Sequence, residues 1–258
     1  MSGDREFAWE GFFNARDLGG LPTRDRRVTR HGRLIRSADL RLVTKAGWHA
    51  AYDAGVRTVI DLRNDDEVRP HAGPSLTALG GSAHLAPGKP IALPPPGVAT
   101  THVPLDDVED VAFWRYLNSE RLNGTPLYFR PFLERKPQRC AAAVAAIAHA
   151  QPGGVIFHCG GGRDRTGLLA LLLLALVDVE PDSIAADYEL STEPRRALLA
   201  AMGMKDDLAL YEQALADRGT TARAAVLATL QGFDAETYLR SAGLTADDLD
   251  RVRSRLLG

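Results

Sequence analysis

The sequence predicts an α/β fold with a central, mostly parallel sheet, flanking helices and a helical C-terminal lid region. Two observations lead to this class. Short apolar segments rich in β-branched residues alternate with helical segments over the first two thirds of the 258 residues. The last third has helical spacing interrupted by glycines. Alternating strands and helices followed by a helical tail are typical of α/β proteins.

The first elements are short and separated by turn residues. Residues 33–36 and 56–62 are expected to form strands, and the second is rich in β-branched residues and follows a glycine. Between them, Thr44 is a suitable N-cap for a helix over 45–54. Residues 71–100 are rich in Gly, Pro, Ala and Ser without a sustained period, which predicts a mobile surface loop.

Helices dominate from residue 111 onward. An alanine-rich segment at 139–150 predicts a helix, and the apolar residues 155–157 predict a short strand. The apolar run 168–177 has about half of the roughly 20 residues that a membrane-spanning helix needs, so a buried helix is expected. Pro181 starts the next helix, and hairpins follow. Five aromatic residues are expected in the core: Phe113, Trp114, Tyr116, Tyr128 and Phe129.

Length and composition favour one domain over residues 1–258, with a helical region at 182–258 packed on it. A net charge of -2 gives no reason to expect a nucleic-acid or acidic-membrane partner. The N-terminal segment has no apolar stretch typical of a secretory signal, which predicts a cytoplasmic protein. Cys140 and Cys159 are too few for a disulfide framework, and no Cys/His spacing predicts a metal or other cofactor.

The chemistry is expected between the 155–157 strand and the apolar helix. There the chain has His158, Cys159, Gly160, Gly161, Gly162, Arg163, Asp164, Arg165, Thr166 and Gly167. A glycine turn that leads into a helix N-terminus can point several backbone N–H groups at one anion. The same field favours the thiolate of a cysteine at the strand end, and the thiolate is the competent nucleophile.

The other side chains of this segment suit the binding of a phosphate. The planar guanidinium of Arg165 can hold two phosphoryl oxygens, whereas a lysine would supply only a point charge. The Thr166 hydroxyl can donate toward the sulfur of Cys159. His158 is expected to support the loop rather than to act as a base. A buried structural cysteine beside a tight turn is the alternative, but the strand, the glycines and the helix all agree with an anion site.

This segment resembles the loop of the bacterial tyrosine/serine phosphatases, which have an HCxxGKDRTG-type sequence and belong to the cysteine-phosphatase superfamily, together with phosphoinositide phosphatases. Arg163 stands where that family usually has Lys and retains its charge. The resemblance therefore implies that Arg163 and Asp164, with the three glycines and Arg165, belong to the phosphate-binding residues. Further similarity covers nearly the whole chain. It includes Asn14-Ala15-Arg16-Asp17-Leu18-Gly19-Gly20, Arg36-Ser37-Ala38-Asp39-Leu40, Asp61-Leu62-Arg63, Asp187-Tyr188-Glu189-Leu190-Ser191 and the segment from Tyr238 to Leu257.

The resemblance implies a phosphomonoester hydrolase with a phosphocysteine intermediate and a general acid. It implies phosphotyrosine as substrate, with phosphoserine, phosphothreonine, phosphoinositides or a small phosphate ester as alternatives. Asp164 matches the aspartate of the family's KDR triplet and is favoured as the acid. Asp106 and Asp107 are the alternative, from a separate loop, as in other cysteine phosphatases.

Four charged residues beside apolar segments are expected to form buried ion pairs that support the loop: Arg16, Asp17, Asp61 and Arg63. Two rival functions remain open, arsenate reduction or other cysteine-loop oxyanion chemistry, and non-catalytic phosphate binding. Arsenate reduction needs a resolving thiol, for which only Cys140 is present. Its place in an alanine-rich helix favours a core residue instead.

Overall fold

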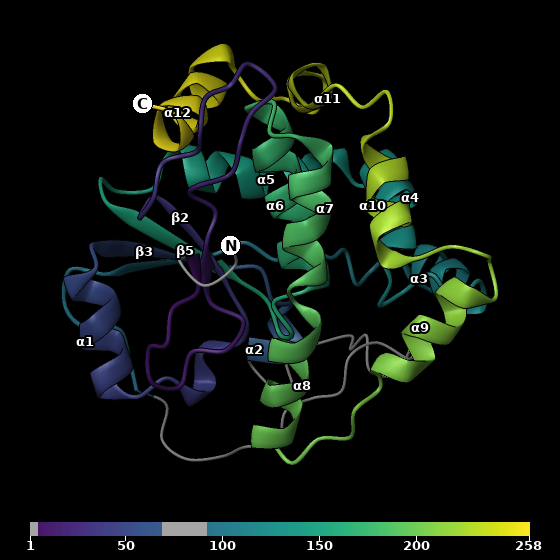
Figure 1. Ribbon diagram of the computed structural model, residues 1–258, viewed down its shortest axis with the longest axis horizontal. Helices are drawn as coiled ribbons and strands as arrows, with labels where there is room; N and C mark the ends of the chain where they lie inside the picture. The colour runs from purple at the N-terminus through teal and green to yellow at the C-terminus, as the bar shows by residue number, and fades with distance from the viewer. Residues whose placement is uncertain (1–4, 69–91) are drawn as a thin grey trace.

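The computed structural model describes residues 5–68 and 92–258 (Figure 1). Within these residues, a five-stranded sheet has the order β1-β2-β5-β3-β4, in which only β1 is antiparallel to its neighbour. This confirms the predicted α/β class with a mostly parallel sheet. The strands are β1 (Arg16–Asp17), β2 (Leu34–Ser37), β3 (Val56–Asp61), β4 (Ala99–His102) and β5 (Gly154–His158).

The helices before β5 are η2 (Leu40–Leu42), α1 (Lys45–Asp53), α2 (Asp65–Val68), α3 (Val111–Ser119), η4 (Pro126–Tyr128), α4 (Phe129–Arg135) and α5 (Pro137–Ala148). Those after β5 are α6 (Asp164–Leu176), α7 (Pro181–Glu189), α8 (Thr192–Ala201), α9 (Leu208–Ala216), α10 (Ala222–Leu230), α11 (Ala235–Ser241) and α12 (Ala246–Leu256). The predicted helix N-cap is confirmed, since Oγ1 of Thr44 accepts from the backbone N–H of Gly47 at 3.1 Å.

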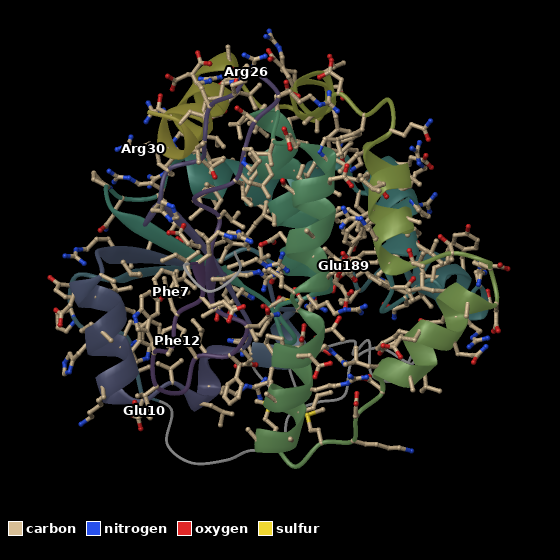
Figure 2. The ribbon with its side chains drawn as sticks, in the orientation of Figure 1. Phe7, Glu10, Phe12, Arg26, Arg30 and Glu189 are labelled. Atoms are coloured by element: carbon tan, nitrogen blue, oxygen red, sulfur yellow. The ribbon has the colours of Figure 1, made fainter. Side chains whose placement is uncertain are left out.

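Helices cover both faces of the sheet. Successive side chains of a strand point to opposite faces, and the buried strand residues accordingly belong by turns to two apolar clusters, one on each face. In β5, Ile156 packs with α1 and the N-terminal aromatic residues, whereas Val155 and Phe157 pack with α5 and α6. The ring of Phe12 meets that of Trp48 on α1 edge-on, with centroids 5.4 Å apart, and Figure 2 shows Phe12 on the α1 side of the molecule.

Most of the predicted core residues are buried as expected. The apolar run in α6 is enclosed almost completely, which explains its uniform hydrophobicity. Phe113, Trp114, Tyr128 and Phe129 are buried, but Tyr116 is 49% exposed, so its assignment to the core was wrong. No helix in the described part of the chain is long and apolar enough to cross a membrane.

The predicted loop over 71–100 was wrong at its end. Residues 99–102 form β4, which pairs in parallel with β3 from Thr58↔Ala99 to Asp61↔His102. Three of the four β4 side chains are exposed, so this edge strand has no apolar alternation to reveal it. Residues 71–91 of the predicted loop lie outside the described residues, and residues 92–98 form neither helix nor strand.

The C-terminal helices fall into two groups. The last two helices, α11 and α12, pack on α5 and α6, and contribute Leu239, Leu249, Val252 and Leu256 to the larger apolar cluster. Figure 1 shows them at the top of the molecule, while α8 lies at the bottom and α9 at the lower right. Within the region 182–258, the C-terminal end of α7 and the helices α8 and α9 therefore lie near the end of the sheet that carries Cys159.

Candidate active site

Cys159 follows the carboxyl end of β5, and α6 begins five residues later at Asp164. Its side chain is 3% exposed. The turn needs glycine at position 162, where φ is +64° and an added Cβ would lie 2.6 Å from the backbone nitrogen of Ala38. The strand, glycine turn and helix predicted from the sequence are thus present.

Three carbonyl oxygens of this loop are held by hydrogen bonds from outside it. The backbone N–H of Asp39 donates to Gly160 at 2.9 Å. The amide Nδ2 of Asn14 donates to Gly161 at 3.2 Å and to Gly162 at 2.9 Å. Nη2 of Arg36 also donates to the Gly162 carbonyl at 2.9 Å.

These contacts determine where the loop N–H groups point. In a trans peptide the C=O of one residue and the N–H of the next point in opposite directions. Holding the carbonyls of residues 160–162 on one side therefore directs the N–H groups of residues 161–163 to the other. Within the described chain, no protein group accepts a hydrogen bond from the amides of residues 160–165. The loop is thus arranged to bind an oxyanion.

Arg165 projects from the first turn of α6 and is held by Glu67, which lies on α2. Its Nη2 donates to Oε1 of Glu67 at 2.8 Å, and Nη1 donates to Oε2 of the same carboxylate. Burial raises the pKa of Glu67, but the charge and hydrogen bonds of Arg165, together with Asn64 and Arg63, outweigh it and lower that pKa to about 2. Among the described residues, Nε of Arg165 has no protein acceptor. The Nε edge of the guanidinium is therefore available for two phosphoryl oxygens.

Asp106 lies behind the same guanidinium, with Oδ2 3.3 Å from Nη1 of Arg165. The same oxygen accepts from Nδ2 of Asn64 at 3.2 Å, and the residue is 7% exposed. Burial and the charge of Glu67 together outweigh Arg165 and raise the pKa of Asp106 to about 6. Asp107, by contrast, turns away to Lys136, whose Nζ donates to Oδ2 at 2.9 Å.

Asp164 is more accessible than Asp106, with 26% of its side chain exposed. Its Oδ1 accepts from the Tyr188 hydroxyl at 2.8 Å. The Arg163 side chain does not lie in the predicted phosphate site, because its Nη1 donates to the carbonyl of Gly124 at 2.8 Å and its guanidinium lies over the Tyr188 ring. The Thr166 hydroxyl is buried and has no hydrogen-bond partner among residues 5–68 and 92–258, so the expected bond to the sulfur of Cys159 is not formed.

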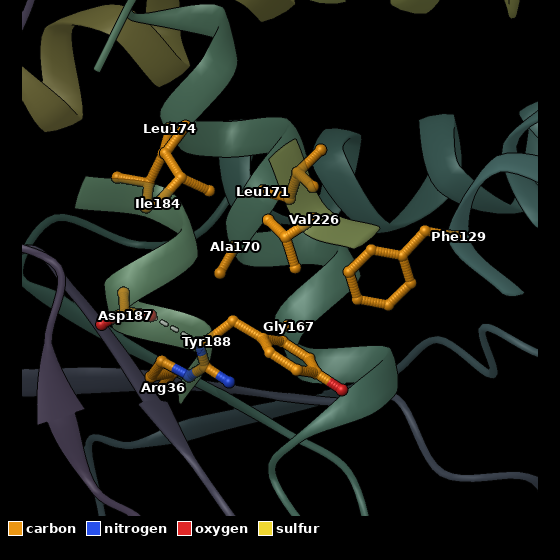
Figure 3. A pocket seen from close by; sticks show the side chains of 10 residues that line it. All are labelled: Arg36, Phe129, Gly167, Ala170, Leu171, Leu174, Ile184, Asp187, Tyr188 and Val226. Carbon is orange, nitrogen blue, oxygen red and sulfur yellow. Dashed lines mark hydrogen bonds and ion pairs between the residues drawn. The ribbon is translucent and has the colours of Figure 1, made fainter. Parts of the chain in front are cut away.

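A buried cluster supports the loop from the side of α7. Asp187 accepts from Nε of Arg16 at 2.9 Å and from Nη1 of Arg36 at 2.5 Å, and Ser191 accepts from both arginines. Two arginines outweigh the cost of burial, so the pKa of Asp187 lies well below its ordinary value. Figure 3 shows Arg36 beside Asp187, and the Tyr188 ring against Gly167. An added Cβ on Gly167 would lie 2.8 Å from that ring.

A second cluster lies beneath the loop on the side of β3. Nη2 of Arg63 donates to Asp61 at 2.6 Å, and its Nη1 donates to Asp39 at 3.0 Å. Nε2 of His158 lies 3.6 Å from Asp61, while burial lowers the pKa of this imidazole. Asp39 also donates its N–H to the loop, so Arg63 supports the loop through Asp39. Asp61 supports it through His158, which directly precedes Cys159.

Asp17 forms a different kind of contact from the predicted loop support. Its carboxylate accepts from the backbone N–H groups of Gly19 at 2.8 Å and Gly32 at 2.7 Å, and it stabilises the turn between β1 and β2. Its ion-pair partner is His31 at 3.3 Å. Asp17 therefore shapes the N-terminal segment instead of contacting the phosphate loop.

Sequence reasoning assigned no role to five residues that contact this site: Asn14, Arg36, Asp39, Glu67 and Asp187. Four of them lie in the motifs that carry the resemblance, which was the available signal. Glu67 lies outside those motifs, in the acidic run 65–67 that follows Arg63 and Asn64. The indication available from the sequence was its position shortly after the strand predicted at 56–62.

The fold and site define a cysteine-dependent phosphatase. The chain belongs to the tyrosine phosphatase family, whose model matches residues 7–258. It is similar to the triple specificity protein phosphatase PtpB of Mycobacterium tuberculosis, with 29% identity over 96% of this chain and 98% of the relative. A Nostoc commune tyrosine-protein phosphatase is 28% identical over 86% of this chain and 73% of the relative. A Cupriavidus necator protein provisionally named a tyrosine-protein phosphatase is 32% identical over 73% of this chain and 63% of the relative.

Proposed function

We propose that the protein hydrolyses phosphate monoesters in two steps through a phosphocysteine at Cys159. The observation that carries this proposal is the loop after Cys159, whose carbonyls at residues 160–162 are held from outside it, while among the described residues its amides and Nε of Arg165 have no protein acceptor. Preorganised donors of this kind stabilise the charge that develops on the phosphoryl group in the transition state of its transfer.

In the first step the Cys159 thiolate attacks phosphorus and the bond from phosphorus to the ester oxygen breaks. Arg165 and the loop N–H groups hold the equatorial oxygens, and Glu67 holds the guanidinium in place. The departing oxygen takes a proton from a general acid. In the second step water attacks phosphorus and gives a proton back to the carboxylate of that acid, the sulfur–phosphorus bond breaks, and inorganic phosphate and the thiolate are released.

Asp164 is the proposed acid, because its carboxylate is a quarter exposed at the start of α6, beside the loop. A leaving group must point out of the loop toward solvent, where a partly exposed carboxyl can reach it. Asp106 is the alternative, and its raised pKa of about 6 favours a carboxyl that carries a proton. Its Oδ2 is occupied by Arg165 and Asn64, which suits a residue that positions Arg165.

The proposed substrates are phosphotyrosine first, and then phosphoserine, phosphothreonine and phosphoinositides. Support comes from the family match and from the relative named a triple specificity protein phosphatase. Arsenate reduction is less well supported, since burial raises the pKa of the Cys140 thiol to about 12 and leaves it protonated near neutral pH.

The test is turnover of nitrophenyl phosphate by wild type and two variants. Cys159→Ser should abolish turnover and retain phosphate binding, because the loop and Arg165 remain. Arg165→Lys should lose about 10²–10³-fold, as is typical when a preorganised transition-state donor is removed. Near wild-type turnover in Cys159→Ser would contradict the nucleophile assignment. Phosphate binding by wild type without any turnover would favour the non-catalytic alternative.

A further inference from the structure

Asn14 reaches the phosphate loop from the segment before β1, although it is far from Cys159 in the sequence. It is 5% exposed, and its Nδ2 donates to two successive loop carbonyls, Gly161 at 3.2 Å and Gly162 at 2.9 Å. Its backbone has a φ of +53°, a left-handed conformation that Asn tolerates better than most residues. An asparagine at this position therefore suits both the local backbone and the contact.

The orientation of the Asn14 amide is set by Arg16. Nη1 of Arg16 donates to Oδ1 of Asn14, and Nε of Arg16 donates to Asp187 at 2.9 Å. With its oxygen facing a guanidinium, the amide has its NH2 group facing the loop. A chain of contacts thus runs from Asp187 through Arg16 and Asn14 to the loop.

The consequence for the loop follows from peptide geometry. Because the carbonyls of residues 161 and 162 are held by Nδ2 of Asn14, the N–H groups of residues 162 and 163 point to the opposite side. Those are two of the amides that have no protein acceptor among the described residues. Within the described chain, losing the Asn14 contact would free the carbonyl of Gly161 and leave that of Gly162 held by Arg36 alone. Both peptide units would then be less firmly oriented, and the loop would bind an anion less well.

We propose that Asn14 is a positioning residue for the reaction, which orients two peptide units of the phosphate loop and so sets its affinity for an oxyanion. This inference rests on the proposed function of the loop as the phosphate site. A purely structural role is the competing explanation, in which Asn14 matters only as an acceptor for Arg16.

Two substitutions separate these explanations. Asn14→Asp keeps an oxygen for Arg16 but replaces the donor with a charged acceptor that faces two carbonyls. Asn14→Ala removes both contacts without adding charge. Vanadate inhibition of nitrophenyl phosphate turnover should weaken about tenfold in Asn14→Ala, as for the loss of two hydrogen bonds, and about a hundredfold in Asn14→Asp.

Asn118→Asp is the matched control, because it adds the same charge at the end of α3 and should leave inhibition unchanged. Thermal unfolding reports whether each variant is folded. The structural role would be supported, and the proposal overturned, if vanadate inhibited Asn14→Asp as strongly as wild type but inhibited Asn14→Ala more weakly. If Asn14→Asp does not fold, unchanged inhibition in Asn14→Ala alone would overturn it. Absence of turnover in wild type would instead refute the proposed function.

Discussion

Asp164 and Asp106 can be distinguished by the leaving group. Protonation matters most for a poor leaving group, because an alkoxide is far more basic than a nitrophenolate. We expect Asp164→Asn to slow hydrolysis of phosphoserine by about 10²–10⁴-fold, the usual general-acid contribution, and hydrolysis of nitrophenyl phosphate much less. Steady-state kinetics on both substrates measures this difference.

The matched variants are Asp106→Asn and Asp107→Asn, for which only small leaving-group dependence is expected. Equal losses on both substrates in Asp164→Asn would make Asp164 a support of the loop. A strong dependence in Asp106→Asn would move the acid to the separate loop.

Asp106 should also affect stability in a pH-dependent way. Its pKa is about 6 in the folded protein, above its ordinary value, because burial and Glu67 disfavour the charged form. Protonated Asp106 therefore contributes to the free energy of unfolding. This contribution is complete below the pKa of Asp106 in the unfolded chain and is lost as pH rises through about 6. Asp106→Asn mimics the protonated form, so its stability relative to wild type should increase by about 3 kcal/mol between pH 4 and pH 8. Urea unfolding at several pH values measures this, and a pH-independent difference would contradict it.

At the scale of elements, α8 and α9 differ from their neighbours. Among the described residues, none from 192 to 216 belongs to either of the two apolar clusters. Their buried leucines, such as Leu198 and Leu208, lie outside those clusters, and ion pairs add to the contacts of the two helices. Arg195 lies along Gly161 of the loop and pairs with Asp207 at 2.6 Å, and Arg196 pairs with Asp206 at 3.1 Å. A segment that contacts the loop without sharing the core is suited to act as a lid.

We expect hydrogen exchange to be faster over residues 193–218 than over the strand residues 155–157. Raising salt to about 0.5 M should accelerate exchange in the first segment further, because partly exposed ion pairs are screened. Exchange measured by mass spectrometry with and without salt tests this. Equal protection of the two segments would argue against a lid.

At the scale of the molecule, one apolar cluster extends from Leu18 near the N-terminus to Leu256 in α12. The C-terminal helix therefore completes the core of the sheet domain, and a single cooperative unit over 1–258 is proposed. Leu249, which is fully buried, provides the test. Leu249→Ala should lower the free energy of unfolding by about 2–5 kcal/mol.

The same variant should keep one unfolding transition, with tryptophan fluorescence and circular dichroism changing together. Separate transitions by the two probes would indicate that the helical region unfolds independently. Leu210, which is 66% exposed on α9, supplies the control, since Leu210→Ala should change stability little.

The sequence alone predicted the chemistry of the loop, because the nucleophile, the glycine turn, Arg165 and the helix that follows are contiguous from 158 to 177. The strands and helices with strong apolar periodicity were also predictable. The exposed edge strand β4 was not, since its side chains show no apolar alternation.

Only the tertiary structure showed which distant residues complete the site. In the parallel sheet, Ser37 of β2 and Asp61 of β3 both pair with His158 of β5. The segments that follow these strands therefore meet at one edge, bringing Asp39 and Glu67 to the loop. Asn14 is brought to the same loop from before β1. Spacing along the chain carries no information about such encounters, because the register and order of the strands determine them.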